Sequence, residues 1–111
     1  MLKSNGTKKI NVSVFFSGKG TNLKNLIKFS KKKNSKFSIK LIISNNYKAE
    51  GLIYGKKYKI KSKIISYRNT RNAERNILDY LKKEKIQLIC LAGYMKILSK
   101  TFIKNFKGKI I

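Results

Sequence analysis

Hydrophobic and polar residues alternate along two early stretches of the chain, and such alternation predicts β-strands. The first stretch covers residues 9–17, and the second runs from residue 37 to residue 43 before the polar triplet at residues 44–46. A short run at residues 63–66 predicts a third strand. The run Leu-Ile-Cys-Leu at residues 88–91 is apolar throughout, which is typical of a strand covered on both faces.

A different spacing, with apolar residues at i, i+3 and i+4, predicts helices between these strands. Leu23, Leu26 and Ile27 predict a helix that ends near Lys32. The longest apolar stripe predicts a helix over residues 70–85, and shorter helices are predicted at residues 49–59 and 99–106, although two glycines weaken the first of these. Strands and helices that alternate in this way predict an α/β fold: a mainly parallel, twisted sheet with helices on both faces, Rossmann-like in layout.

A chain of 111 residues has the length of one domain and can bury roughly 65% of the surface that its unfolded form exposes. We expect a polar N-terminal tail at residues 1–8 and a single domain at residues 9–111. The segment Gly-Lys-Ile-Ile at residues 108–111 is similar to the opening of a fifth strand. The sequence therefore predicts an incomplete, truncated domain.

The charge is strongly positive, with 28 Lys and Arg against 4 Asp and Glu and a formal net charge of +24. Such an excess favours anionic partners. Lysines spread over every predicted element would also follow from a coding bias toward A and T, and both explanations stay open. With no apolar segment of signal-peptide or membrane-spanning length, we expect a soluble, cytoplasmic protein.

Few residues in the chain suit metal binding or nucleophilic catalysis. The sequence contains no histidine, one cysteine and four scattered carboxylates, so we expect no metal site. Cys90 cannot form an intrachain disulfide and lies within an apolar strand. We expect it to be a small buried core residue rather than a nucleophile.

The segment Ser-Gly-Lys-Gly-Thr-Asn at residues 17–22 links the first strand to its helix. Glycines let the backbone approach an anion, and the amides that open a helix favour negative charge. The segment is not a Walker A loop, and Leu23 replaces the third glycine of the dinucleotide fingerprint. With these two nucleotide-binding motifs excluded, a site for a small phosphomonoester is the anion-binding interpretation that stays open. Thr21 and Asn22 can cap the helix or add side-chain hydrogen bonds to phosphate oxygens. The alternative to a phosphate site is a tight turn with Asn22 as the N-cap.

Three segments together resemble one family: SGKGTNL at residues 17–23, IISNN at residues 42–46, and ICLAGYMKILSKTF at residues 89–102. They resemble glycinamide ribonucleotide formyltransferase, the folate-dependent enzyme of the third step of purine synthesis. The similarity extends over nearly the whole chain after Lys8. Formyltetrahydrofolate deformylases share the Tyr-Met-x-Ile-Leu run but usually lack a glycine turn of this form.

The resemblance implies two sets of binding residues. The phosphate of 5-phosphoribosylglycinamide would be held by Gly20, Thr21 and Asn22. The pterin of the co-substrate 10-formyltetrahydrofolate would be bordered by Tyr94, Met95, Lys96, Ile97 and Leu98. A family arginine that meets the folate has its nearest counterpart in Arg71, for which a solvated position on a helix face is the alternative. Lys96 stands where many members of the family have Arg, so it keeps the charge without the planar fork.

The catalytic residues that the resemblance implies are an Asn, a His and an Asp. The first two fall in an Asn-Ile-His-Pro run expected one residue beyond Ile111. The carboxylates present, on predicted helices, are Glu50, Glu74, Asp79 and Glu84. We therefore assign no catalytic residue to these 111 residues and predict that they give no turnover alone, while carrying the substrate-binding part of a formyltransferase.

A second hypothesis is a small basic nucleic-acid-binding α/β module, with Tyr47, Tyr54 and Tyr58 as stacking partners. The lysines are not concentrated in one segment, and no nucleic-acid-binding motif is recognised. We expect contact with nucleic acid only through non-specific charge, and the sequence predicts no oligomeric state.

Overall fold

The structure is a computed structural model that describes residues 8–111. Apart from Lys8, the predicted tail at residues 1–8 lies outside the described residues. The strands are β1 (Ile10–Phe16), β2 (Phe37–Ser44), β3 (Lys61–Ile64), β4 (Leu88–Leu91) and β5 (Lys109–Ile110). The helices are α1 (Thr21–Ser30), α2 (Leu52–Lys57), α3 (Thr70–Lys83) and α4 (Lys100–Asn105).

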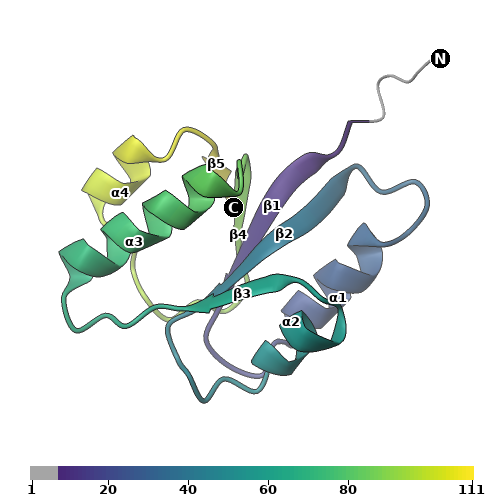
Figure 1. The fold of residues 1–111 in the computed structure, drawn as a ribbon, viewed down its shortest axis with the longest axis horizontal. Coiled ribbons are helices and arrows are strands. Elements are labelled where there is room, and N and C mark those ends of the chain that lie inside the picture. Colours follow the sequence, from purple (N-terminus) through teal and green to yellow (C-terminus); the bar gives the residue numbers. More distant parts are fainter. Residues whose placement is uncertain (1–7) are drawn as a thin grey trace.

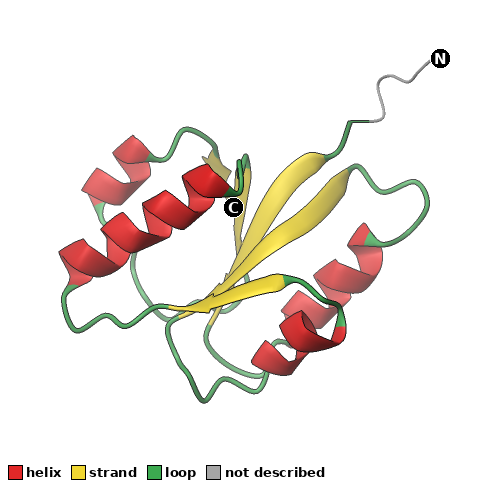
Figure 2. Cartoon of the chain, viewed as in Figure 1, coloured by secondary structure: helices red, strands yellow, loops and turns green. Residues whose placement is uncertain are grey.

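The strands form one five-stranded sheet in the order β3-β2-β1-β4-β5, and every pair of neighbouring strands is parallel. Each strand returns through a helix, so the helices form layers on the sheet (Figures 1 and 2). Helices α1 and α2 lie on one face, and helices α3 and α4 lie on the other. The predicted parallel α/β sheet with helices on both faces is confirmed.

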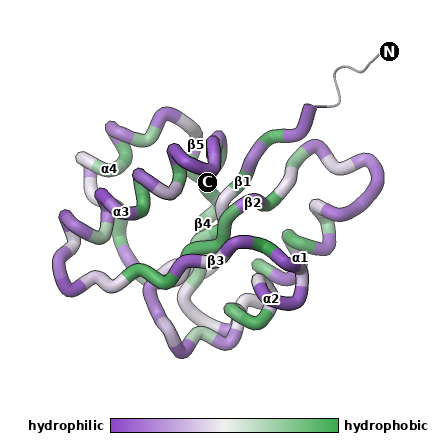
Figure 3. Tube along the Cα trace, in the orientation of Figure 1, coloured by the Kyte–Doolittle hydropathy of each residue, from purple (hydrophilic) through white to green (hydrophobic). Residues whose placement is uncertain are grey.

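Each face of the sheet has its own apolar core. One core joins alternate residues of β1 and β2, among them Phe15 and Leu41, to buried residues of α3 and α4. The other joins Val14 and Phe16 of β1 to Leu23 and Ile27 of α1. Figure 3 shows apolar segments where the strands meet and polar segments along the outer turns. Burial of these residues from water is the main force that holds both layers on the sheet.

The element boundaries match the predictions closely, with two exceptions. The helix predicted at residues 49–59 is shorter and spans Leu52–Lys57. The third strand was expected at residues 63–66 but spans Lys61–Ile64. It is an edge strand that pairs only with β2, and its sequence KSKI is mostly polar with only partial burial. The prediction followed the apolar pair Ile64 and Ile65, so the strand was placed two residues too close to the C-terminus.

The prediction that residues 88–91 are covered on both faces is wrong. Ile89 is fully buried against the core under α3 and α4, but Leu91 is 39% exposed and Cys90 is only partly buried. A hollow of about 400 Å³ lies between α1 and the end of this strand, and Cys90 lines it. Cys90 is therefore a half-buried residue that packs against the core beneath α1, and not the buried core residue that was expected.

Within residues 8–111, no helix is both long enough and apolar enough to cross a membrane.

Candidate functional site

Because all strands run in parallel, their carboxyl ends meet at one edge of the sheet, where ligands of open α/β folds bind. Four connections lie at this edge: the glycine turn after β1, the segment after β2 that leads into α2, the segment after β3 that leads into α3, and the loop after β4. The topology thus brings together the two stretches, residues 17–22 and 94–98, which the sequence analysis selected although they lie far apart in the chain.

Gly20 sits at the point where the chain leaves the turn and enters α1. It is the N-cap residue, with φ 77° and ψ 26° in the left-handed region, which an L-residue with a side chain adopts only under strain. A Cβ atom at Gly20 would also lie 2.7 Å from the Cα of Gly51. Both the backbone conformation and the packing therefore require glycine at this position.

Gly51 supports the turn from the other side. A Cβ atom there would lie 2.4 Å from Cε2 of Phe16 and 2.8 Å from the Cα of Gly20. The Gly51 amide donates a hydrogen bond of 3.1 Å to the carbonyl of Gly18. Two backbones are thus in direct contact, and the start of α2 fixes the shape of the glycine turn. The sequence analysis had treated Gly51 only as a weak point of the predicted helix.

The alternative in which Asn22 caps α1 is wrong, and Thr21 does not cap this helix either. Both are the first helical residues and exposed, and no side chain among residues 8–111 makes a capping hydrogen bond to this helix. The first amides of a helix have no intrahelical acceptor, so those of Thr21, Asn22 and Leu23 need a partner from outside the helix. The first turn of α1 contains no acidic residue. These amides and the positive end of the helix dipole suit a small anion.

The loop after β4 sends its side chains in two directions. Tyr94 and Leu98 turn inward and pack against the core beneath α3 and α4. Met95 and Ile97 are 78% and 92% exposed, and Lys96 is exposed beside them. Three of the five residues predicted to border a pterin therefore form the outer surface of the loop, while the other two hold it down.

Tyr94 is fixed beneath the loop by aromatic contacts and one hydrogen bond. Its hydroxyl lies 2.7 Å from the hydroxyl of Tyr67, and its ring meets the ring of Phe15 edge to face at 5.2 Å between centroids. Burial, followed by the hydrogen bond with Tyr67, raises the pKa of Tyr94 well above its ordinary value. Burial also raises the pKa of Tyr67. Both phenols are therefore neutral at physiological pH and act as structural supports.

Ser17, the last residue before the glycines, connects three strand ends. Its hydroxyl donates to the side-chain oxygen of Asn45 and accepts a hydrogen bond of 2.8 Å from the amide of Met95. Its own amide donates to the carbonyl of Gly93 at 3.2 Å. Its carbonyl accepts from the side chain of Asn46 at 3.2 Å. The two predicted ligand sites are thus joined through one buried serine.

Arg71 is exposed near the start of α3 and lines a groove of about 630 Å³ between α3 and α4. Arg75, one turn further on, lines the same groove, which reaches Ser99 just after the loop at residues 94–98. The two arginines could contact an extended anionic ligand that reaches from the loop into this groove. The loop at residues 94–98 does not line the groove itself.

Glu74 is the one buried carboxylate among the described residues, and sequence reasoning gave it no role. Its two oxygens accept hydrogen bonds from Ser99, at 2.8 Å from the amide and 2.5 Å from the hydroxyl. Only its apolar neighbours at i–1 and i+3, Ala73 and Ile77, signalled that it shares the buried face of α3.

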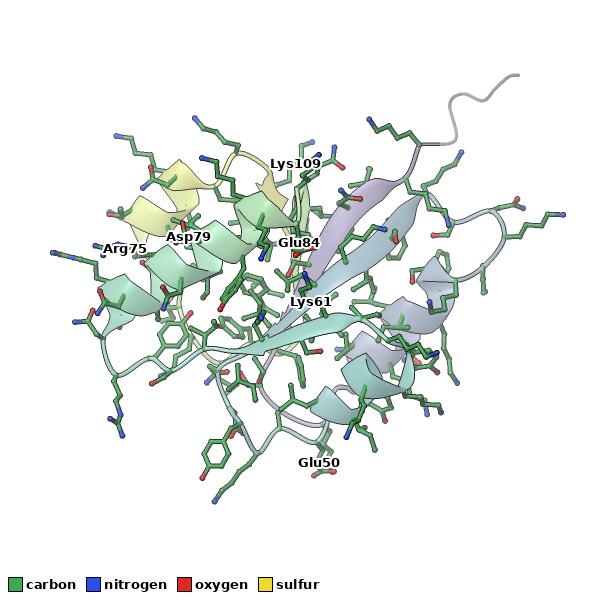
Figure 4. The ribbon with its side chains drawn as sticks, in the orientation of Figure 1. Glu50, Lys61, Arg75, Asp79, Glu84 and Lys109 are labelled. Carbon is green, nitrogen blue, oxygen red and sulfur yellow. The ribbon has the colours of Figure 1, made fainter. Side chains whose placement is uncertain are left out.

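The remaining carboxylates lie away from the glycine turn or point to solvent (Figure 4). Glu50 is exposed just before α2, rather than within a helix as predicted. Asp79 is exposed on α3, and Glu84 pairs with Lys61 at 2.6 Å. Within the part of the chain that the structure describes, no three metal-ligating side chains come together. Burial raises the pKa of Cys90, so its thiol stays protonated.

The aromatic residues considered for nucleic-acid binding do not form one surface. Tyr47 is 71% exposed, but Tyr54 and Tyr58 pack against the core beneath α1 and α2. The ring of Tyr54 also lies against Gly20. Nitrogen-tipped side chains project around the whole outline of the molecule in Figure 4, which agrees with the even spread of lysines in the sequence.

Comparison with known proteins places the chain in a known family. Residues 10–111 match the Formyl transferase family. The chain is 38% identical over 103 residues to a phosphoribosylglycinamide formyltransferase from Haemophilus influenzae, covering 90% of this chain and 49% of that protein. It is 39% identical over 108 residues to the trifunctional purine biosynthetic protein adenosine-3 of Gallus gallus, covering 95% of this chain and 11% of that protein.

A solved structure of phosphoribosylglycinamide formyltransferase from Brucella melitensis superposes with a TM-score of 0.88 and 31% identity, covering 93% of this chain and 55% of that one. The chain thus spans about half the length of these bacterial relatives. The family match runs from the first residue of β1 to residue 111, so it includes every described strand and the connections at the carboxyl edge. The protein belongs to the formyl transferase family.

Proposed function

We propose that this chain provides the substrate-binding part of a phosphoribosylglycinamide formyltransferase, which passes a formyl group from 10-formyltetrahydrofolate to the amine of 5-phosphoribosylglycinamide in purine biosynthesis. The observation that carries this proposal is the meeting of a glycine turn and an apolar loop at one sheet edge, joined through Ser17. The identities to named formyltransferases support it.

In this proposal the sugar phosphate binds at the start of α1. The amides of Gly20, Thr21 and Asn22 donate to its oxygens, and the helix dipole adds about 0.3–1 kcal/mol to the binding of an anion. The left-handed Gly20 directs the turn so that no Cβ atom intervenes. Lys19, exposed beside the turn, adds positive charge that attracts the phosphate.

The flat pterin of the folate lies against the loop after β4. Met95 and Ile97 give it apolar contact on the exposed side of the loop, and the loop backbone offers donors and acceptors to the ring edge. Tyr94 and Leu98 keep the loop in place from beneath. Lys96 and Arg71 supply positive charge for the carboxylates of the folate, which we place along the groove between α3 and α4.

These 111 residues contain no histidine, and Glu74, the carboxylate nearest the loop, is already bonded through both oxygens to Ser99. No described group is therefore placed to deliver a proton to a leaving nitrogen. We propose that the chain alone binds substrates without formyl transfer. We also keep a cytoplasmic location as part of this proposal.

Calorimetric titration of the chain with 5-phosphoribosylglycinamide tests the function, with random-sequence duplex DNA titrated in parallel at two salt concentrations. We expect saturable binding of the sugar phosphate that Gly20→Ala abolishes. DNA binding should fall steeply with salt, as for any strongly basic protein, and be unaffected by that substitution. Tight DNA binding without any binding of the sugar phosphate would instead favour the nucleic-acid-binding module.

A further inference from the structure

The loop at residues 94–98 has a short, exposed and largely apolar outer surface, yet its two ends are fixed by side chains from distant parts of the chain. At the first end, Met95 donates its amide to the hydroxyl of Ser17 at 2.8 Å. At the other end, Ser99 donates both its amide and its hydroxyl to Glu74. Both supporting residues are buried, each at 7% exposure.

We propose that Ser17 and Glu74 are positioning residues for the folate, which act through the loop and do not touch the ligand. This inference rests on the proposed function, because it assumes that the loop at residues 94–98 borders a folate. Neither residue was assigned a role by its sequence pattern. The hydroxyl of Ser17 points to Asn45 and Met95, so its side chain serves the loop rather than the first amides of α1.

The hydrogen bonds at each end are part of larger contacts, which makes the two ends rigid. The hydroxyl of Ser17 is oriented because it donates to Asn45 while it accepts from Met95. The hydroxyl of Ser99 is oriented because it donates to Glu74 while it accepts from the amide of Phe102 at 3.1 Å, as the N-cap of α4. At each end of the loop, the two hydrogen bonds of the serine hydroxyl therefore restrict both the position and the orientation of the backbone.

The carboxylate of Glu74 strengthens the hydrogen bonds to Ser99 at the second end of the loop. Hydrogen bonds to an ionised carboxylate are shorter and stronger than those between neutral groups, and both oxygens of Glu74 are used. A glutamine at this position would keep one oxygen for the Ser99 amide but would place an NH₂ group, a donor, opposite the hydroxyl. The side chains of Met95, Lys96 and Ile97 are exposed, and Tyr94 adds the hydrogen bond to Tyr67.

The test compares binding of two ligands by the 111-residue chain. Ser17→Ala and Glu74→Ala should each raise the Kd for 10-formyltetrahydrofolate about fivefold or more, the effect of losing one hydrogen bond in a binding surface. The Kd for 5-phosphoribosylglycinamide should change less than about twofold, because the glycine turn is held by Gly51. Glu74→Gln should fall between the wild-type chain and Glu74→Ala.

Matched controls separate positioning from general loss of stability. Ser35→Ala removes a serine that also makes two hydrogen bonds, at the opposite edge of the sheet. Glu84→Gln removes a carboxylate near the other end of the same helix. Neither control should change the folate Kd. Equal weakening of both ligands by Ser17→Ala and Glu74→Ala, or no difference from these controls, overturns the inference.

Amide hydrogen exchange gives a second readout that needs no ligand. In the wild-type chain the amides of Met95 and Ser99 should be protected. Ser17→Ala should speed exchange at Met95 and Glu74→Ala at Ser99, with Lys24 in α1 unchanged. If the wild-type chain does not bind folate, the proposed function fails, and the exchange rates still decide whether these two side chains hold the loop; unchanged rates would exclude it.

Discussion

The glycine turn and the loop after β4 lie at the same edge of the sheet, but they are built in different ways. The turn depends on the absence of two side chains, because Gly20 and Gly51 approach so closely that neither can carry a Cβ atom. The loop depends on side chains, since Ser17, Tyr67 and Glu74 hold it by hydrogen bonds. One region is fixed by backbone packing, and the other by hydrogen bonds from remote residues.

This difference decides how each region tolerates substitution. A side chain added at Gly20 or Gly51 meets backbone, which cannot move aside, so the cost is steric. A side chain removed from the supports of the loop leaves donors or acceptors without partners, so the cost is a few hydrogen bonds. We therefore expect a single substitution in the turn to cause a large loss of stability and binding, and a single substitution in the supports of the loop to cause a smaller one.

The largest effect is expected for Gly51→Ala. Its Cβ atom would overlap Phe16 and Gly20, and overpacking of this kind costs about 1–3 kcal/mol. The midpoint of thermal unfolding should fall by roughly 4–8 °C for each kcal/mol in a domain of this size. Binding of 5-phosphoribosylglycinamide should weaken more than binding of the folate.

The matched control is Gly18→Ala, because no described atom lies within 4 Å of a Cβ at that position. Its thermal midpoint should stay close to that of the wild-type chain. Equal losses of stability for Gly51→Ala and Gly18→Ala would show that close backbone packing does not hold the turn.

Tyr94→Phe should have an intermediate effect, because it removes the 2.7 Å hydrogen bond to Tyr67 and keeps the ring against Phe15. We expect a loss of about 1 kcal/mol in the free energy of unfolding, measured by urea denaturation. Tyr47→Phe, at a residue that is 71% exposed, is the control and should unfold at the same urea concentration as the wild-type chain. If the two variants behave alike, the tyrosine pair does not support the loop.

Met95→Ala should change stability by less than about 0.5 kcal/mol, since its side chain is 78% exposed. It should nevertheless weaken binding of 10-formyltetrahydrofolate several-fold and leave the Kd of the sugar phosphate unchanged. Exposed Ile53 on α2 provides the control, because Ile53→Ala removes a similar apolar area away from the loop. A folate Kd unaffected by Met95→Ala would mean that the outer surface of the loop does not meet the ligand.

The smallest effect is expected at the ion pair between Lys61 and Glu84, which lies outside both regions. The hydrogen bond from Lys61 holds the pKa of Glu84 below its usual value. The pair therefore stabilises the fold above the unfolded carboxyl pKa of about 4.3. Its contribution disappears as the pH falls through the lowered folded value.

Because Lys61 is about half exposed, solvent screening limits this contribution to a few tenths of a kcal/mol. Urea unfolding of Lys61→Met should show a small loss of stability at pH 7 that shrinks steadily as the pH is lowered through the acidic range. A loss of stability that does not change with pH would contradict this explanation, because protonation of Glu84 removes the ion pair from the wild-type chain.

The sequence predicted the architecture well because alternation and helical spacing reflect burial directly. The strands that contain Val14 and Leu41, and the helix that contains Ile77, follow from which residues face the core. The edge strand β3 was misplaced because a strand with one neighbour, half exposed, does not need an apolar sequence. Likewise, the run at residues 88–91 looked fully buried although one of its faces borders a hollow.

The glycine turn could be predicted for a similar reason, since a left-handed residue at the start of a helix restricts the chain to glycine at Gly20. The supports of the loop could not. Ser17 and Glu74 are polar residues within local patterns that are equally typical of exposed positions, and their partners lie 78 and 25 positions away. Only the folded arrangement shows which polar residues are buried together.

The central claim is that backbone amides at the start of α1 donate hydrogen bonds to the phosphate of a ribose phosphate. A crystal structure of the chain soaked with 5-phosphoribosylglycinamide tests it most directly. The account predicts phosphate oxygens within hydrogen-bonding distance of the amides of Gly20, Thr21 and Asn22. A ligand bound elsewhere, or a turn left empty at a concentration that saturates binding in solution, would contradict it.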